Sequence, residues 1–441
     1  MATMLDCKWD TYLDAVGTCE CLSLEGRITR AVGLVAEGEG LGMSIGSLCL
    51  VETDENCAIR AEVVGFKEDR VLLMPYGDTR GIRPGSRISF LDKSPRVDVS
   101  DAFLGRVVDG LGMPLDGKGG IKATGQYPLY GHPMNPMQRA SIRERMDVGI
   151  AAVNGLIPLG RGQRIAIMAG SGVGKSVLMG MMTRHTAADV TVIGMIGERG
   201  REVKEFVEEN LGPDGMKKAV VVAATSDSPP LVRMRGAYLA TTLAEYFRDQ
   251  GKHVLLIIDS ITRFAMSSRD VGLAAGEPPT SRGYTPSFFA KIPVLLERAG
   301  SVQNSGSITG IYTVLVEGDD LNDPVGDTVR SIVDGHIVLS RKMANRGHYP
   351  AIDVLESVSR VMRDVIDPEH LALRERTIDI LAAYQGAEDM ITIGAYVDGS
   401  DPRIDQAKQL MPEIDKFLRQ DISQRIPYDT SLDQLKKVYQ D

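Results

Sequence analysis

The central part of the chain, from about residue 96 to residue 365, alternates short apolar runs with segments of helical length. The runs are almost continuously apolar, as in strands covered on both faces of a parallel sheet. Segments 176–185 and 231–250 lie between such runs and have the length and composition of helices. The pattern predicts a doubly wound α/β sheet, with strands at 164–168, 190–196, 219–224, 253–259, 307–316 and 336–340.

The segments on either side of this central part have different patterns. From Cys19 to Phe90, short β-rich runs are separated by glycines. Runs of this length and spacing are typical of a small β-barrel or a β-sandwich, and both remain open. Beyond Asp367 the chain is helical and charged up to its end, and only residues 391–397 (ITIGAYV) have the pattern of a strand.

The first 18 residues carry apolar side chains at helical spacing, which predicts a short amphipathic helix. Such a face either packs on the domain that follows or offers a docking site to a helix of a partner. Both uses remain open. The apolar positions are Met4, Leu5, Trp9, Tyr12, Leu13 and Val16.

Composition places the chain among ordinary soluble globular proteins. Of its 441 residues, 43% are hydrophobic and 25% are charged, and the formal net charge is −9. A protein whose main task is to coat nucleic acid needs a basic footprint, so this charge argues against that class. The sequence has no run of about 18 apolar residues and no N-terminal stretch of signal-peptide character, which predicts a cytosolic or peripheral protein.

Cysteine and histidine give no sign of a metal site or a disulfide framework. The five cysteines all lie within the first 57 residues, are odd in number and form no CxxC pair. We therefore expect free thiols in a reducing compartment. The six histidines have neither HxxxH nor HExxH spacing, so a histidine metal site is not expected.

The strongest chemical signal is the run AGSGVGKS at 169–176, which follows an apolar strand and opens a helix. Glycines let backbone N–H groups converge on phosphate oxygens, and the helix N-terminus adds a favourable dipole, so this context predicts a phosphate-binding P-loop. Lys175 is expected to reach the β- and γ-phosphates, and the Ser176 hydroxyl to ligate Mg²⁺. The predicted nucleotide-binding residues are Gly170, Ser171, Gly172, Val173, Gly174, Lys175, Ser176 and Val177.

Two carboxylates lie at the ends of predicted strands. Asp259 ends an apolar strand of the same sheet, where a carboxylate can hold Mg²⁺ through water. Glu198, in the run GERGRE, lies at the carboxyl edge, where it can orient or deprotonate an attacking water. Arg199 beside it could neutralise charge on the γ-phosphate. The alternative is a surface cluster of ion pairs within residues 198–202.

Residues 349–360 (YPAIDVLESVSR) carry little signal by composition, since Tyr349 could be a packed surface aromatic and Arg360 a solvated charge. The segment PAIDVLESVS, however, is similar at each defining position to the signature of the α/β family of rotary-type ATPases. Together with the P-loop, GERGRE and LLIIDSITRFA, it resembles the core of a RecA-type hexameric ATPase.

Within that family the chain resembles the flagellar and type III protein-export ATPases. The resemblance runs from about Gly26 to the C-terminus and includes GRITRAVGLVAEGEG and LGRVVDGLGMPLDGKG near its beginning. It implies an N-terminal β-barrel, a RecA-like core and a C-terminal helical domain. The segments most specific to the export ATPases are AGSGVGKSVLMGMM, MIGERGREVKEFVEENLG, ATTLAEYFRDQGK, EPPTSRGYTPSFFAKIPVLLERAG and TVLVEGDDLNDPVGDTVRSIVDGHIVLSR.

The resemblance implies a role for each candidate in the catalytic centre. Lys175 and Ser176 take their P-loop roles, and Asp259 is the acid directed at Mg²⁺. Glu198 is the catalytic glutamate, and Arg199 is a phosphate contact. Non-catalytic subunits of the heterohexameric rotary enzymes lack the glutamate, so its presence implies a catalytic subunit.

Two further roles follow from the resemblance of residues 349–360. Tyr349 matches the aromatic residue that stacks on adenine in catalytic subunits. Arg360 matches the arginine finger that is inserted into the site of a neighbouring subunit. The loop at 283–285 resembles one that faces the central channel.

The implied organisation is a regulator-docking helix at 1–18, a β-barrel at 19–95, a RecA-like ATP-binding domain at 96–365 and a mainly helical domain at 366–441. The implied protein is a homohexamer that hydrolyses MgATP for protein export through a flagellar type III apparatus, at the cytoplasmic face of the cell membrane. The implied partners are a stator-like regulator on the N-terminal helix, a central coiled-coil stalk protein, membrane proteins of the export gate, secretion substrates and chaperones, and no nucleic acid.

Four other functions share this core. An injectisome-type secretion ATPase has the same motifs. The export-type segments disfavour the catalytic subunit of a rotary ATP synthase. A Rho-like helicase is disfavoured by the net charge of −9 and by an N-terminal domain without clustered aromatic and basic residues for stacking on single strands. Glu198 disfavours a structural subunit that binds ATP without turnover.

Overall fold

The computed structural model describes residues 25–40, 42–54, 57–303, 305–316 and 323–440. The chain forms two compact units, Met1–Pro95 and Arg96–Asp441. The expected helix at 1–18 and the cysteines Cys7, Cys19 and Cys21 lie outside the described residues.

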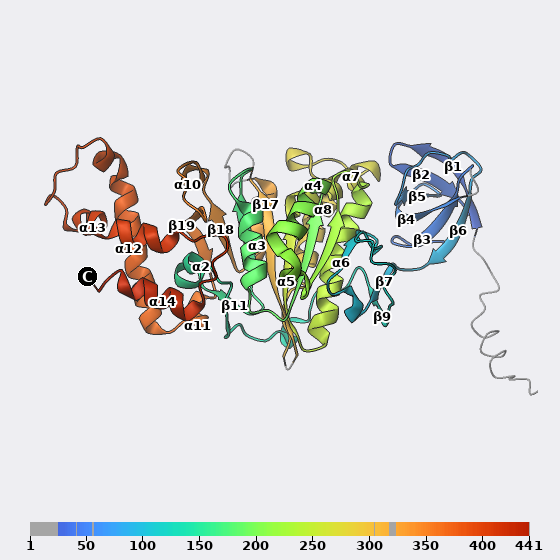
Figure 1. Ribbon diagram of the computed structural model, residues 1–441. Helices are drawn as coiled ribbons and strands as arrows, with labels where there is room; N and C mark the ends of the chain where they lie inside the picture. The colour runs from blue at the N-terminus through green and yellow to red at the C-terminus, as the bar shows by residue number, and fades with distance from the viewer. Residues whose placement is uncertain (1–24, 41, 55–56, 304, 317–322, 441) are drawn as a thin grey trace, which may run out of the picture. The chain divides into compact units, whose positions relative to one another are not determined.

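The first unit is a closed β-barrel of six antiparallel strands, in the order β1-β2-β5-β4-β3-β6 (Figure 1). Its interior is filled by buried aliphatic side chains, among them Ile28, Val63 and Ile88. Of the two alternatives that the glycine-punctuated runs left open, the barrel is therefore the one observed. The strands are β1 (Glu25–Val32), β2 (Val35–Glu39), β3 (Leu48–Glu52), β4 (Ala58–Lys67), β5 (Arg70–Pro75) and β6 (Arg87–Asp92).

The second unit is built on a nine-stranded sheet in the order β19-β18-β12-β17-β15-β13-β14-β8, with β16 paired to β17 outside this path. Along this path the seven strands other than β19 run parallel, whereas β19 is an antiparallel edge strand and β16 pairs antiparallel with β17. The predicted α/β class is confirmed. The strands are β8 (Val107–Asp109), β12 (Arg164–Ala169), β13 (Val190–Ile196), β14 (Ala219–Ala224), β15 (His253–Asp259), β16 (Gly300–Ser301), β17 (Ser307–Leu315), β18 (Gly335–Leu339) and β19 (Ile352–Ser359).

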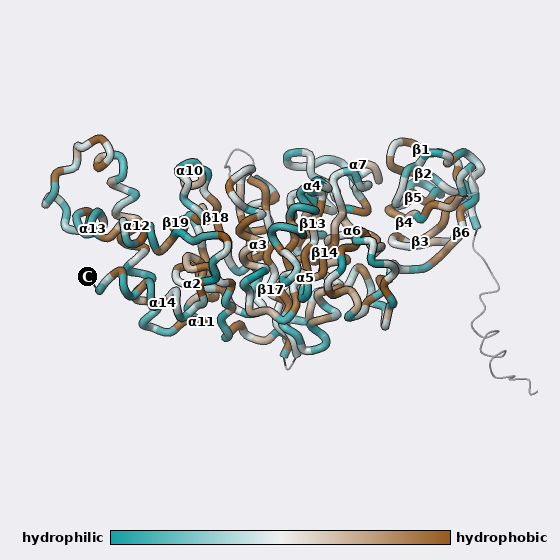
Figure 2. The backbone as a smooth tube through the Cα atoms, viewed as in Figure 1, coloured by the Kyte–Doolittle hydropathy of each residue, from teal (hydrophilic) through white to brown (hydrophobic). Residues whose placement is uncertain are grey.

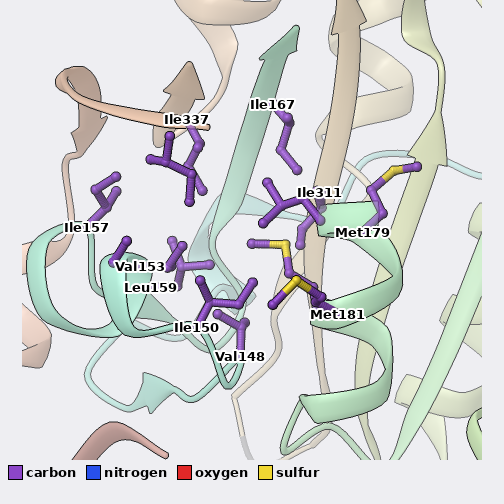
Figure 3. Close-up of a cluster of buried hydrophobic side chains, with 14 of the residues drawn as sticks. Val148, Ile150, Val153, Ile157, Leu159, Ile167, Met179, Met181, Ile311 and Ile337 are labelled. Atoms are coloured by element: carbon purple, nitrogen blue, oxygen red, sulfur yellow. The ribbon is translucent and has the colours of Figure 1, made fainter. Parts of the chain in front are cut away.

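Helices cover both faces of this sheet, which explains why its strands are apolar on both sides. On one face, α6 (Pro230–Asp249) lies along β13, β14 and β15, followed by α7 (Ile261–Ala274), α8 (Pro286–Leu296) and α9 (Pro324–Ile332). On the other face, α2 (Ala151–Leu156) and α3 (Lys175–His185) share one hydrophobic core with the sheet. Figure 3 shows side chains of this core, among them Val153, Ile157, Ile167, Met179, Met181, Ile311 and Ile337.

Shorter elements connect the sheet and its helices. Two small antiparallel ribbons are β7 (Arg96–Val99) with β9 (Gly125–Pro128), and β10 (Arg145–Met146) with β11 (Leu159–Gly160). The short helical segments are η1 (Asp101–Phe103), η2 (Pro136–Gln138), α4 (Gly200–Glu205), η3 (Phe206–Leu211), α5 (Gly212–Met216), η4 (Ser281–Gly283), α10 (Arg341–Asn345) and α11 (Met362–Val365).

The C-terminal helices belong to the same compact unit as the sheet. They are α12 (Pro368–Thr392), α13 (Pro402–Leu418) and α14 (Tyr428–Lys437). Their buried side chains, such as Leu381, Phe417 and Leu435, join the core that contains α2 and α3. Figure 2 shows the resulting pattern, with hydrophobic colouring in the strands and more hydrophilic colouring along α12 to α14.

The prediction of a strand at residues 391–397 is wrong. Helix α12 continues to Thr392, and Gly394 then takes a left-handed conformation with φ of 72°. The N–H of Ala395 donates to the carbonyl of Met390, which is the closing hydrogen bond of a glycine-terminated helix end. The apolar residues at the end of this helix and just after it therefore produce a sequence pattern like that of a strand. In the described parts of the chain, no helix is both long and apolar enough to cross a membrane.

Candidate active site

The predicted P-loop connects the carboxyl end of β12 to the first residue of α3. Gly174 precedes the helix with φ of 91°, a left-handed conformation that glycine adopts without steric cost. This turn directs the first N–H groups of α3 towards the carboxyl edge of the sheet. Ser171, Gly172 and Ser176 are exposed there, which leaves the predicted phosphate-binding groups open to a ligand.

Three of the predicted site residues come together at this edge. The ammonium group of Lys175 donates to Asp259 Oδ1 at 2.5 Å and to Glu198 Oε1 at 3.4 Å. Asp259 is the last residue of β15, and Glu198 follows β13, its neighbour in the sheet. Because these strands are parallel, their carboxyl ends place both carboxylates beside the P-loop.

The structure adds Thr313 of β17, a residue that the sequence analysis did not single out. Its Oγ1 donates to Asp259 Oδ1 at 2.6 Å, and both side chains are buried. Thr313 thereby fixes the orientation of the carboxylate at the edge of the site. This contact arises because β15 pairs with β17, and the linear sequence does not show which strands pair.

Burial controls the charge of the site. It raises the pKa of Glu198 to about 7, with Lys175 opposing the rise and Asp259 adding to it. Burial also disfavours the ammonium form of Lys175, but the two carboxylates outweigh this effect and raise its pKa. At neutral pH the lysine is therefore a cation, while Glu198 lies near the midpoint of its titration, as suits a general base.

We expect kcat/KM for ATP hydrolysis to rise as the pH increases through about 7. Glu198 can accept a proton from water only when it is ionised, and the profile of kcat/KM reports the free enzyme, whose Glu198 pKa is about 7. The measurement is kcat/KM from about pH 5 to about pH 9, with Mg²⁺ in excess over ATP. A profile that is flat through this range would contradict the assignment of Glu198 as the base.

Tyr349 lies against the P-loop although it is remote from it in sequence. A Cβ atom placed on Gly174 would be 3.4 Å from Cε1 of the Tyr349 ring. The side chain is 45% exposed, so one side of the ring remains available to a ligand. This position suits the predicted contact with a nucleotide base, and that role stays a prediction.

The two predicted arginines do not join the cluster around Lys175. The Arg199 side chain is 81% exposed and pairs with Glu202. Arg360 follows β19, and its backbone N–H donates to the carbonyl of Asp334. Asp334 binds Arg164 at the amino end of β12, so Arg360 lies at the edge of the sheet opposite the P-loop.

This separation excludes a contact between Arg360 and the P-loop of its own chain. The six residues of β12 lie between the two edges, which corresponds to about 17 Å at about 3.3 Å per residue. The arginine side chain is exposed, and Nη2 donates to the carbonyl of Arg330 at 3.3 Å. Because β19 is an edge strand, Arg360 can meet another molecule.

The loop around residues 283–285, which is expected to face a central channel, is exposed only in part, and Gly283 is half-buried. Tyr284 and Thr285 are buried, and the Tyr284 ring packs against Phe288 with centroids 4.8 Å apart. Ser281 and Arg282, just before them, are exposed. A contact with a partner in a channel would therefore involve this part of the loop.

Three family models match the chain. The model described as the ATP synthase alpha/beta family, nucleotide-binding domain, matches residues 149–359. The beta-barrel domain of the same family matches residues 28–92. A model described as the T3SS EscN ATPase C-terminal domain matches residues 366–437.

Individual relatives match nearly the whole chain. A flagellum-specific ATP synthase of Pseudomonas aeruginosa is 50% identical over 95% of this chain and 93% of its own length. The protein of the same name from Salmonella typhimurium is 49% identical over 98% of both chains. A type 3 secretion system ATPase of Xanthomonas euvesicatoria is 47% identical over 94% of both chains.

Solved structures of type III secretion ATPases resemble the fold of this chain. The assembled ATPase EscN from the type III secretion system of enteropathogenic E. coli has a TM-score of 0.89 at 43% identity, and the match covers 94% of this chain and 99% of EscN. EscN in complex with its central stalk EscO has a TM-score of 0.86 at 42% identity, with the same coverage.

Proposed function

The chain belongs to the ATP synthase alpha/beta family, among its flagellum-specific and type III secretion ATPases, and we propose that it hydrolyses MgATP to drive protein export through a flagellar type III secretion apparatus. The observation that carries this proposal is the convergence of Lys175, Glu198 and Asp259 beside the P-loop. ATP hydrolysis requires a cation for the phosphates, a group that positions the attacking water and an acid that holds the metal.

Nucleotide binding begins with the P-loop. Backbone N–H groups of residues 170–177 surround the phosphates, and the N-terminus of α3 adds its dipole. Lys175 exchanges its two carboxylate partners for the β- and γ-phosphates. Tyr349 stacks on the adenine ring, and Arg199 contacts a phosphate oxygen.

Glu198 is the proposed base for the water that attacks the γ-phosphate. Its ionised carboxylate accepts a proton from that water at Oε1 or Oε2. Lys175 lowers the pKa of Glu198 in the chain without nucleotide, so moving the ammonium group to the phosphates strengthens the base. The proton is taken up when the nucleophile is formed.

Ser176 and Asp259 are the proposed residues that hold Mg²⁺. The Ser176 hydroxyl would ligate the ion and the Asp259 carboxylate would hold it through water, which suits magnesium because at phosphate sites it commonly takes only one or two protein ligands. The buried Asp259 carboxylate is already oriented by Thr313, which is the kind of support that a metal-directed acid needs. Magnesium, when bound with ATP, neutralises charge on the β- and γ-phosphates.

We extend the proposal to the organisation of the chain. Residues 1–18 serve to dock a stator-like regulator, 19–95 are the barrel domain, 96–365 the catalytic domain and 366–441 the helical domain. The protein acts as a homohexamer, since Arg360 lies too far from its own P-loop to act there and the similar ATPase EscN is found assembled.

The proposed partners follow from the same relatives. EscN forms a complex with a central stalk, EscO, and we propose a central coiled-coil stalk protein for this chain. The remaining proposed partners are membrane proteins of the export gate, secretion substrates and their chaperones. The chain then works in the cytoplasm, bound peripherally to the inner face of the cell membrane at the export apparatus.

An injectisome is the second candidate system, because the Xanthomonas secretion ATPase is 47% identical and EscN is 43% identical to this chain. The flagellar function is preferred because relatives named flagellum-specific reach 50% identity over most of the chain.

Deleting the gene from its own cell is expected to abolish export of hook and filament proteins and to abolish swimming. Plasmid-borne wild-type protein should restore both, and the Glu198→Gln variant should restore neither, because it lacks the proposed base. The measurement is the amount of flagellin in the culture supernatant together with motility. A deletion strain that exports flagellin normally but fails to secrete injectisome substrates would instead favour the second candidate.

A further inference from the structure

The loop that carries Tyr349 is held by the end of helix α13. The backbone N–H of Gln420 donates to the carbonyl of Tyr349 at 3.1 Å. Nη1 of Arg419 donates to the carbonyl of Gly347 at 3.0 Å. Two carbonyls of the loop are therefore bound by residues that directly follow α13, and not by the central sheet.

Asp415, one turn earlier on α13, orients these groups. Its Oδ2 accepts from Nε of Arg419 at 2.7 Å, and its Oδ1 lies 3.2 Å from Nε2 of His348. The side chain of His348 is 7% exposed, so this partner is largely shielded from solvent. Asp415 thus contacts both the loop residue before Tyr349 and the arginine that holds Gly347.

Gln420 also ties this end of α13 to the start of α2. Its Nε2 donates to the carbonyl of Gly149 at 2.8 Å, and its Oε1 accepts from the N–H of Ala151 at 2.9 Å. The side chain is buried, so these bonds have little competition from water. Because the backbone N–H of Gln420 also binds the carbonyl of Tyr349, this residue joins the start of α2 to the Tyr349 loop.

Beside these contacts the packing is incomplete. A cavity of about 640 Å³ lies between α10 and β19 on one side and α12 and α13 on the other. Its apolar lining includes Leu355, Leu381 and Met411, and Asp415 and Arg419 lie at its wall. Because this space is not filled by side chains, packing holds α13 to β19 only in part, and the polar contacts of Asp415 and Arg419 add to it at the wall of the space.

We propose that Asp415 and Arg419 are positioning residues for Tyr349, and that they couple the placement of α13 to the affinity of the P-loop site for ATP. This inference rests on the proposed stacking of Tyr349 on adenine. The Tyr349 ring lies over Gly174 on one side, and the carbonyls on either side of His348 are held by Arg419 and Gln420. Losing the Arg419 contact removes one of the two hydrogen bonds that hold these carbonyls, so part of the binding energy of ATP must be used to order the aromatic ring.

Arg419→Ala is expected to raise the KM for MgATP about tenfold and to leave kcat within about twofold of wild type. Hydrogen bonds to charged groups are worth enough to account for a change of about one decade. Arg419→Lys, which keeps a donor, should recover part of the affinity. The matched control is Arg403→Ala, because Arg403 also lies on α13, is 85% exposed and pairs with Asp401 at the start of the helix. This control should leave KM and kcat unchanged.

A double-mutant cycle with Tyr349→Ala separates the inference from the function on which it rests. We expect Tyr349→Ala to raise the KM, and Arg419→Ala to add little in that background because both changes remove the same contact. If Tyr349→Ala leaves the KM unchanged, the stacking role and the inference are both wrong. If Tyr349→Ala raises the KM while Arg419→Ala does not, or if the two effects are additive, only the inference is overturned.

Discussion

Glu198→Gln is expected to bind MgATP with nearly wild-type affinity and to lower kcat by roughly 10²–10⁴-fold, the contribution of a general base. The amide keeps the size of the carboxylate but cannot accept a proton from water. Lys175 retains Asp259 as its closer partner, at 2.5 Å against 3.4 Å for Glu198, so the P-loop lysine stays in place. The substitution therefore removes the proposed general base and preserves the nucleotide-binding site.

The measurement combines equilibrium binding of ATP with the rate of phosphate release. Glu205→Gln is the matched control, since Glu205 is an exposed carboxylate of the adjacent helix α4. The control should hydrolyse ATP at the wild-type rate. Wild-type turnover by Glu198→Gln would show that another group activates the water.

Arg360→Ala is expected to lower the rate of ATP hydrolysis by about 10³–10⁵-fold, the contribution of an arginine that stabilises charge on the transferred phosphoryl group. In the structure this arginine is exposed and lies at the end of the sheet opposite the P-loop. It directly follows β19, the outermost strand of the sheet. If it acts in hydrolysis, it acts on a nucleotide bound by a neighbouring copy. The specific activity of the wild-type protein should consequently rise steeply with protein concentration.

Arg363→Ala controls for a general effect of removing a cation from this surface. Arg363 lies three residues away, is 77% exposed and lies 3.7 Å from Glu375. Its replacement should leave both the rate and the concentration dependence unchanged. A specific activity that does not depend on protein concentration, together with full activity of Arg360→Ala, would exclude the role in trans.

The strands and the P-loop could be predicted because their signals are local. The six predicted central strands are almost continuous apolar runs, and burial on both faces of a parallel sheet imposes that pattern directly, whereas β8 and the alternating edge strand β19 were not predicted. Lys175, Glu198 and Asp259 could be placed at one edge because the carboxyl ends of parallel strands meet there. The alternation at 391–397, in contrast, imitates a strand because Gly394 ends α12 within an apolar stretch.

The contacts that the sequence did not predict are those between distant segments. Thr313 reaches Asp259 only because β17 pairs with β15, and nothing around Thr313 in the sequence indicates a polar partner. Likewise, Arg419 binds the carbonyl of Gly347 across a gap of 72 residues. Such contacts depend on which helices and strands become neighbours in the fold. This cannot be read from the order of residues along the chain.

Mixing two inactive variants tests most directly the central claim that ATP is hydrolysed at sites shared between neighbouring copies of this chain. Arg360→Ala retains an intact P-loop, and Lys175→Ala retains an intact arginine. In a ring with head-to-tail interfaces, random mixing of equal amounts places an intact P-loop against an intact arginine at about a quarter of the interfaces. We predict that each variant alone is nearly inactive and that the mixture recovers phosphate release. A mixture that stays as inactive as its components, under conditions in which the two variants assemble together, would contradict the account.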